Sequence, residues 1–149
     1  MSSLVIRRAT PEDRAAVEAL LDTSWRTHWA PHVEPESIER FEREQPVIGY
    51  VETYIDQFML AERGGVIAGM YHLEAGVLHA IHVHVRFIGS GVGRVLMDHA
   101  EAAGARWLDV RAFNSRARAF YERRGWRAVA EMEASEMGTP VRSILMERR

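Results

Sequence analysis

The chain has 149 residues, of which 47% are hydrophobic, and a formal net charge of −2 at pH 7, which suits one domain with a core of its own. Because it contains no cysteine, disulfides, cysteine metal sites and a thiol nucleophile are excluded. The charge gives no electrostatic case for nucleic acid, and no stretch approaches the ~18 apolar residues of a membrane span. We expect a cytoplasmic protein with one domain, residues 1–149, and no nucleic-acid or membrane partner.

The first third of the chain predicts one strand followed by helices. Residues 4–8 form a short apolar run that indicates a strand. Thr10 and Pro11 have the preferences of a helix N-cap and a first helical position. The apolar positions of this helix recur at helical spacing: Ala16, Val17, Leu20 and Leu21. Residues 34–44 indicate a second, acidic helix. Residues 46–57 fit either an irregular segment or a helix with these inward positions: Val47, Val51, Tyr54 and Ile55.

From residue 58 onward, short strands alternate with turns and two helices. Gly64 and Gly65 separate two strand-like runs and are a hairpin signal. The predicted strands are residues 58–63, 66–73, 77–85, 107–113, 126–135 and 141–147. One helix follows a glycine-rich turn and ends at Gly104, with Val92, Leu96 and Ala100 inward, and a second covers residues 115–124. This order predicts an α/β fold with a single mixed, largely antiparallel sheet flanked by helices.

The glycine-rich turn joins a strand to a helix and reads Gly89-Ser90-Gly91-Val92-Gly93. Glycines allow a backbone to approach a ligand closely, and amide N–H groups at a helix N-terminus attract anions such as a pyrophosphate. The turn is not a P-loop, because no Gly-Lys-Ser/Thr follows. It is not a dinucleotide fingerprint either, because Arg94 stands where the third glycine belongs. By itself the turn fits a pyrophosphate site and a turn without a ligand about equally.

A second motif runs from Asn114 to Trp126 and reads Asn-Ser-Arg-Ala-Arg-Ala-Phe-Tyr-Glu-Arg-Arg-Gly-Trp. It resembles the GNAT superfamily pattern of Asn, then Ala, then Tyr, closing in Gly and an aromatic residue. The glycine turn resembles the acyl-CoA loop of the same superfamily, and the two motifs stand in the expected order. Ile88 and Val85 depart from the pattern, which usually has Gln or Arg and often has Pro there. Ile88 removes one side-chain contact to the cofactor.

The resemblance implies the GNAT acyl-CoA N-acyltransferase fold, with acetyl-CoA as co-substrate and without a metal ion. It implies main-chain bonds to pantetheine from Ile81, His82 and Val83. It implies a pyrophosphate site formed by Gly89, Ser90, Gly91, Val92, Gly93 and Arg94. It also places Asn114 and Tyr121 near the cofactor.

Two residues of the second motif have a structural and a functional interpretation. Tyr121 shares a helical face with Ala117, so it fits a core position, and the motif around it favours a general acid that protonates the leaving thiolate. Asn114 stands before a helix, where asparagine is a preferred N-cap, and a cofactor contact would be additional. With no cysteine to form an acyl-enzyme, direct attack in a ternary complex is favoured.

Two residues are candidates for the base that deprotonates the amine. Asp109 resembles the acidic position of ribosomal-protein alanine acetyltransferases in the superfamily. His79 lies where some arylalkylamine acetyltransferases carry a histidine relay, and strict strand alternation gives it the same face as Ile81 and Val83. We place Asp109 ahead of His79. Each also has a structural alternative: Asp109 could pair with Arg111 or a neighbouring arginine, and His79 could take a surface or core position.

Residues 25–33 fall where the resemblance places the acceptor. Trp25 and Trp29 are four residues apart and share a helical face, which fits core packing or a pocket wall. In a pocket, His32 and Glu34 could recognise a cationic amine. The acidic positions that follow, Glu36, Glu39, Glu42 and Glu44, fit a solvated face.

The sequence thus predicts an N-acetyltransferase that moves an acetyl group from acetyl-CoA to a primary amine of a small molecule or peptide. A CoA-binding module without catalysis is the alternative class, and a nucleic-acid-binding role is a distant third. A homodimer is compatible with the sequence, which does not identify the acceptor.

Overall fold

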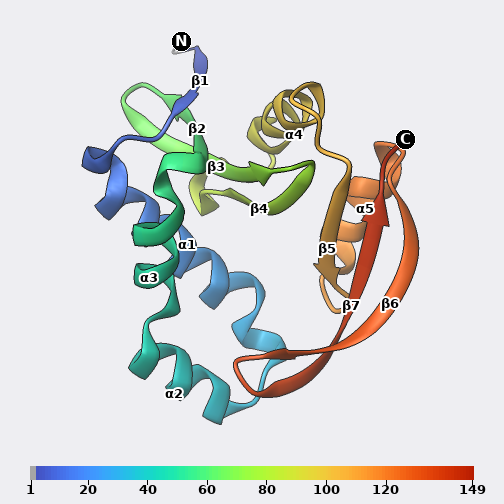
Figure 1. Cartoon of the computed structure of the whole chain (residues 1–149). Coiled ribbons are helices and arrows are strands. Elements are labelled where there is room, and N and C mark those ends of the chain that lie inside the picture. The colour runs from blue at the N-terminus through green and yellow to red at the C-terminus, as the bar shows by residue number, and fades with distance from the viewer. Residues whose placement is uncertain (1–2) are drawn as a thin grey trace.

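The computed structural model describes residues 3–149, and within them one seven-stranded sheet runs in the order β1-β2-β3-β4-β5-β7-β6 (Figure 1). The strands are β1 (Leu4–Arg8), β2 (Phe58–Arg63), β3 (Val66–Glu74), β4 (Val77–Val83), β5 (Trp107–Arg111), β6 (Arg127–Glu136) and β7 (Thr139–Glu147). The α-helices are α1 (Arg14–His28), α2 (Pro35–Glu44), α3 (Pro46–Tyr54), α4 (Val92–Ala102) and α5 (Ser115–Arg123). Strands β4 and β5 are parallel, and the other neighbouring pairs are antiparallel. The predicted α/β class with a mixed, largely antiparallel sheet is confirmed.

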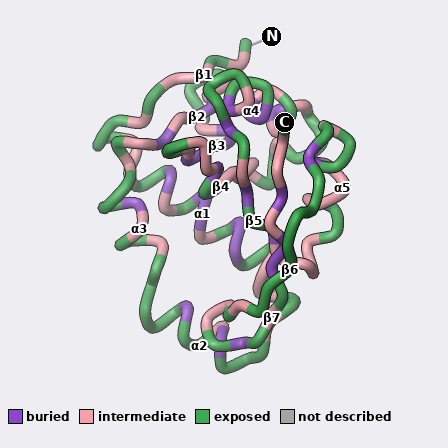
Figure 2. The backbone as a smooth tube through the Cα atoms, turned by 45° about the vertical axis from the view of Figure 1, so that its right-hand side comes forward, coloured by how far each residue is buried: buried purple, intermediate pink, exposed green. Residues whose placement is uncertain are grey.

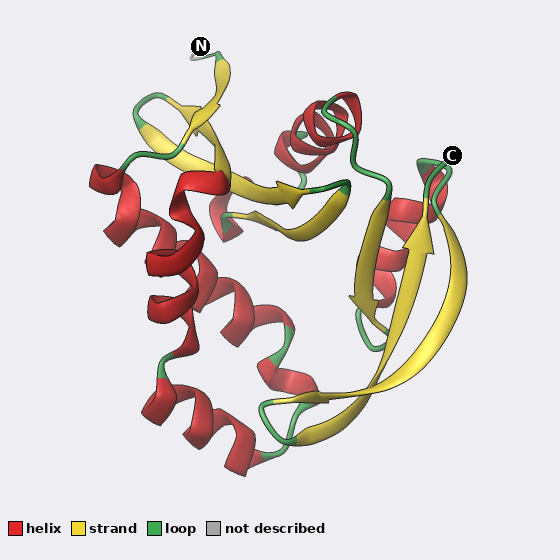
Figure 3. Ribbon diagram, viewed as in Figure 1, coloured by secondary structure: helices red, strands yellow, loops and turns green. Residues whose placement is uncertain are grey.

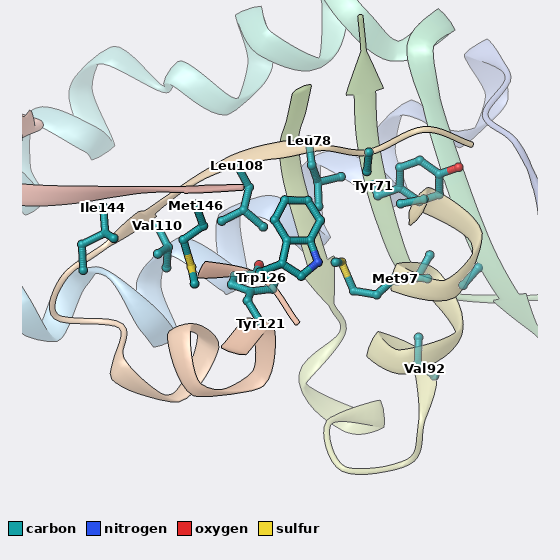
Figure 4. Packing of buried hydrophobic residues seen from close by; sticks show 14 of the residues in the cluster. Tyr71, Leu78, Val92, Met97, Leu108, Val110, Tyr121, Trp126, Ile144 and Met146 are labelled. Carbon is teal, nitrogen blue, oxygen red and sulfur yellow. The ribbon is translucent and has the colours of Figure 1, made fainter. Parts of the chain in front are cut away.

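Helices cover both faces of this sheet (Figure 3). Helices α1 and α3 pack over one face, where the buried cluster is Val17, Leu20, Leu21, Val51, Phe58, Leu60 and Met70. Helices α4 and α5 pack over the other face, where Trp126 lies among Leu78, Leu108 and Met97 (Figure 4). The predicted inward positions of α4 are fully buried there: Val92, Leu96 and Ala100. The edge strand β6 is mostly exposed (Figure 2).

Several element boundaries and faces differ from those predicted. A 3-10 turn, Pro11–Asp13, precedes α1, and the Thr10 N–H donates to Asp13 Oδ2 at 2.8 Å. Ala16 is exposed rather than buried. Residues 46–57 are helical, as α3 and a 3-10 turn, but Tyr54 is 39% exposed and does not face inward. Strand β4 ends two residues earlier than predicted because the chain enters another 3-10 turn, Val85–Phe87.

Gly69 on β3 packs so closely that no side chain fits, a feature that was not predicted. An added Cβ would lie 2.7 Å from the His82 carbonyl oxygen and 2.8 Å from Leu96 Cδ1. We expect Gly69→Ala to lower the free energy of unfolding by about 1–3 kcal/mol, the usual range for overpacking. Gly49→Ala is the control, because nothing lies within 4 Å of its Cβ and helix propensity favours alanine there by about 1 kcal/mol. Urea unfolding measures both changes, and equal stability of the two variants would contradict this packing argument.

Candidate active site

A cavity of about 730 Å³ opens where β4 and β5 separate. The two strands pair only through Val77 with Trp107 and Leu78 with Leu108, and beyond these residues they diverge (Figure 1). Side chains and main chain from α1, β4, the glycine turn, β5, α5, β6 and β7 line the space. The cavity therefore brings together segments that contain both motifs of the sequence.

The edge of β4 offers main-chain groups to this cavity. The His84 N–H donates to the Ala68 carbonyl oxygen of β3 at 2.8 Å, and main-chain groups of successive strand residues point to alternate sides. The main-chain N–H and C=O of Ile81 and Val83 therefore point away from β3, toward the cavity. Those of His82 point toward β3, so His82 lines the cavity through its side chain, not through the main-chain bonds that were expected.

The glycine turn closes one end of the cavity. Gly89 (φ 84°) and Gly91 (φ 92°) adopt left-handed backbone, and Gly91 is the N-cap of α4. Both line the cavity together with Gly93 and Arg94, whereas Ser90 and Val92 are not among the lining residues. The Ser90 hydroxyl donates to the Phe87 carbonyl oxygen and the Val92 side chain is buried, so neither side chain offers a donor to an anionic ligand.

The α5 wall contains the two predicted residues of the second motif. Tyr121 is buried and lines the cavity, and burial raises the pKa of its phenol to about 12. No hydrogen bond to its hydroxyl is found among residues 3–149. Asn114 Oδ1 accepts a hydrogen bond from the Ala117 N–H at 3.3 Å, so the predicted N-cap is confirmed, and Asn114 also lines the cavity.

Asp109 faces the cavity from β5. Leu108 and Val110 beside it are buried, so strand alternation turns the exposed Asp109 to the opposite face. In the described part of the chain its carboxylate has no hydrogen-bond or ion-pair partner, and the pairing with Arg111 that the sequence left open does not form. An unpaired carboxylate in a cavity suits a cationic ligand.

The face predicted for His79 is wrong because β4 contains a bulge. Ala80 pairs with His72 and Leu78 pairs with Leu73, which leaves His79 as an extra residue. Its ring therefore lies 4.7 Å from that of His72, on the α3 side of the sheet rather than the face of Ile81 and Val83. Its Nε2 is 3.8 Å from Glu74 Oε2, and the side chain is 39% exposed. His79 is still one of the residues that line the cavity.

Helix α1 adds residues that sequence reasoning missed. Ser24 and His28 line the cavity one helical turn apart, and Ser24 Oγ lies 2.7 Å from His82 Nδ1. Burial, and then the nearby charge of His28, lowers the pKa of His82 to about 4. Burial and Arg116 also lower the pKa of His28. The signal for Ser24 was a polar residue in the apolar stripe of the first helix.

Trp25 in α1 and Trp29, the C-cap residue of that helix, have different surroundings. Trp25 stacks on Phe41 with ring centroids 3.9 Å apart, whereas Trp29 lines the cavity. The His32 ring stacks on Phe113. Neither His32 nor Glu34 is among the residues that line the cavity. The suggestion that these two residues recognise an amine in the cavity is therefore not supported by their positions.

The floor of the cavity contains an ion pair that the sequence did not predict. Arg111 Nε donates to Glu136 Oε1 at 2.9 Å, and the Trp25 indole N–H donates to Glu136 Oε2 at 3.0 Å. Arg111 Nη1 also donates to Ser143 Oγ. These bonds join α1, β5 and the hairpin of β6 and β7, three parts of the chain that lie far apart in the sequence.

Within residues 3–149, no cluster of three or more His, Asp or Glu side chains has the arrangement of a metal site. In the same range, no helix has the length and apolar character needed to cross a bilayer.

Comparison with known proteins identifies the family. The model of the acetyltransferase (GNAT) family matches residues 10–126, whereas no curated protein sequence matches. Among solved structures, apo YjaB from Escherichia coli is 20% identical over 97% of both chains, with a TM-score of 0.78. PaiA N-acetyltransferase from Thermoplasma acidophilum, solved with coenzyme A, is 18% identical over 99% of both chains, with a TM-score of 0.74.

A third similar structure is a GCN5-related N-acetyltransferase from Rhodopseudomonas palustris. It is 25% identical, with a TM-score of 0.77, and the match covers 99% of this chain and 96% of that one. The family model covers most of the present chain and includes both motifs that line the cavity. This protein therefore belongs to the acetyltransferase (GNAT) family and is an acyl-CoA-dependent N-acetyltransferase.

Proposed function

We propose that this protein transfers an acetyl group from acetyl-CoA to a primary amine by direct attack within a ternary complex. The observation that carries the proposal is the single cavity that contains the glycine turn, the open edge of β4, Tyr121 and Asp109. The absence of cysteine removes a thiol nucleophile that could carry the acetyl group. The acceptor amine is then the nucleophile.

The cofactor end of the cavity has the groups that a pyrophosphate and a pantetheine arm need. Main-chain N–H groups of residues 89–94 at the start of α4 would bind the pyrophosphate, helped by the positive end of the helix dipole. The main-chain groups of Ile81 and Val83 would bind the pantetheine amides and leave the thioester near Tyr121. Arg94 adds positive charge at this end, which partly offsets the missing side-chain contact at Ile88.

The reaction needs a proton removed from the amine and a proton supplied to the leaving thiolate. A lysine-like ammonium has a pKa near ~10.4, so it needs a base at neutral pH. Asp109 would attract the ammonium and take its proton, directly or through a water molecule. The Tyr121 hydroxyl remains protonated because its pKa is raised to about 12, so it can donate a hydrogen bond to the thiolate.

Asp109→Asn should slow the reaction more than His79→Gln does. The carboxylate faces the cavity without a partner among the described residues, whereas His79 lies beside His72 and Glu74 on the α3 side of the sheet. Loss of a base typically costs about 10²–10⁴ in rate, and the remaining rate should rise more steeply with pH as neutral amine becomes limiting. The measurement is kcat/KM against pH for both variants. A larger defect in His79→Gln would transfer the role of base to the histidine.

A CoA-release assay across primary amines tests the proposed function. The panel contains amino acids, polyamines, aminoglycosides and short peptides, and mass spectrometry identifies the acetylated product. We expect amine-dependent CoA release for at least one class. Saturable acetyl-CoA binding without transfer to any of these amines would contradict a primary amine of these classes as the acceptor.

A further inference from the structure

Arg111 is a cavity-lining cation to which the proposed reaction gives no role. Its guanidinium donates from Nε to Glu136 Oε1 at 2.9 Å, from Nη1 to Ser143 Oγ at 2.5 Å and from Nη2 to the Ser135 carbonyl oxygen at 3.3 Å. An arginine side chain has five N–H donors. These bonds use three, so one N–H remains on each terminal nitrogen.

The surroundings of Arg111 hold the guanidinium in one orientation. Glu136 is fixed in turn by the Trp25 indole N–H at 3.0 Å, and Ser143 is buried. The Arg111 and Glu136 side chains are only 22% and 13% exposed. A donor held in this way loses little conformational entropy when it binds a ligand, and this favours affinity.

The charges around Arg111 differ from those at the other end of the cavity. The other lining arginines, Arg94, Arg116 and Arg123, come from α4 and α5. Glu136 balances the charge of Arg111, whereas Asp109, two residues earlier on the same face of β5, has no partner among the described residues. This part of the cavity thus has one unpaired negative charge and two spare N–H donors.

A ligand with an ammonium and a carboxylate a few bonds apart fits both features. Residues i and i+2 of a strand are separated by about 7 Å, which two side chains can span with one small molecule between them. A simple amine would meet Asp109 and leave the spare Arg111 donors to water. An amino acid would meet both groups, with its ammonium beside Asp109 and its carboxylate accepting from the spare N–H groups of Arg111.

We propose that Arg111 is a specificity-determining residue that binds the acceptor's carboxylate, and that the acceptor is a free amino acid. The proposal rests on the proposed function, since it names the substrate class of the same cavity. The ammonium would lie toward Asp109 and the carboxylate would accept hydrogen bonds from the terminal nitrogens of Arg111.

The test compares L-amino acids with their carboxamides as acceptors for the unaltered protein. A carboxamide keeps the α-amine and side chain but has no negative charge, and its less basic amine is neutral more often. Without carboxylate recognition the amide should therefore react faster. We expect the acid to have a kcat/KM about 10- to 100-fold higher, the range of a hydrogen bond to a charged group. Faster acetylation of the amides would overturn the proposal and indicate a peptide-like acceptor.

Variants locate the preference at Arg111. Arg111→Gln should abolish or reverse the acid-to-amide ratio, Arg111→Lys should keep part of it because the charge remains, and Arg116→Gln should leave the ratio unchanged. An unchanged ratio in Arg111→Gln with native circular dichroism would overturn the assignment. Calorimetric titration of acids and amides into CoA-saturated protein decides the question without catalysis. Equal or undetectable binding of the two would also overturn it, whereas failure of acetyl transfer to every amine counts against the proposed function.

Discussion

Tyr121→Phe is expected to lower kcat about 100-fold while acetyl-CoA binds with nearly unchanged affinity. The ring contacts Phe120 and Trp126, and phenylalanine keeps this packing, so the loss is confined to the hydroxyl. General acids typically contribute about 10²–10⁴ in rate. Because burial raises the pKa of the phenol to about 12, it is a weak acid, and we expect an effect at the low end of that range.

The defect should appear in single-turnover rates, which report the chemical step. Tyr54→Phe is the matched control, because Tyr54 is exposed and is not among the cavity-lining residues. Its kcat should equal that of the unaltered protein. If Tyr121→Phe showed a wild-type single-turnover rate, water rather than Tyr121 would protonate the thiolate.

The protein is expected to lose stability between pH 6.5 and pH 4, in large part through His82. Burial lowers the pKa of His82 from 6.5 to about 4, so below pH 6.5 the unfolded chain binds a proton that the folded protein does not. The contribution of neutral His82 to the free energy of unfolding is complete above pH 6.5 and is lost as the pH falls toward 4. At about 1.36 kcal/mol per pKa unit, it is at most about 3 kcal/mol, since the cavity admits water.

Urea unfolding at several pH values measures this loss. His82→Asn retains a polar group near Ser24 but cannot gain the proton, so its stability should vary less with pH. His84→Asn, two residues along the chain, is the control and should follow the unaltered protein. Equal pH dependence in His82→Asn and the unaltered protein would assign the acid sensitivity to other groups, His72 and His28 among them.

Features that lie within one segment could be predicted from the sequence. The glycine turn, the Asn114 cap and the position of Tyr121 each depend on residues only a few places apart, so their local preferences were sufficient. The succession of strands and helices along the chain followed from hydrophobic patterning and turn residues. The order of elements did not show that β4 and β5 separate after two paired residues, because that order does not specify how far two strands pair.

Features that join distant segments could not be predicted. The Ser24–His82 bond links residues 58 positions apart, and the Arg111–Glu136 pair links residues 25 apart. His79 was assigned to the wrong face because a bulge depends on how two strands pair, and alternation within one strand does not reveal it. The contacts of Arg111 and His82 in the cavity therefore require the three-dimensional structure, whereas the glycine turn can be recognised from neighbouring residues in the sequence.

The most direct test of the central claim, that acetyl-CoA binds in the cavity between β4 and β5, is calorimetric titration of acetyl-CoA into the unaltered protein and Gly91→Val. Gly91 has φ 92° and begins α4, so valine would strain the turn and fill the space where the pyrophosphate belongs. The account predicts saturable binding to the unaltered protein that is lost in a Gly91→Val variant with native circular dichroism. Equal affinity in the two proteins, or no binding at millimolar acetyl-CoA, would contradict it.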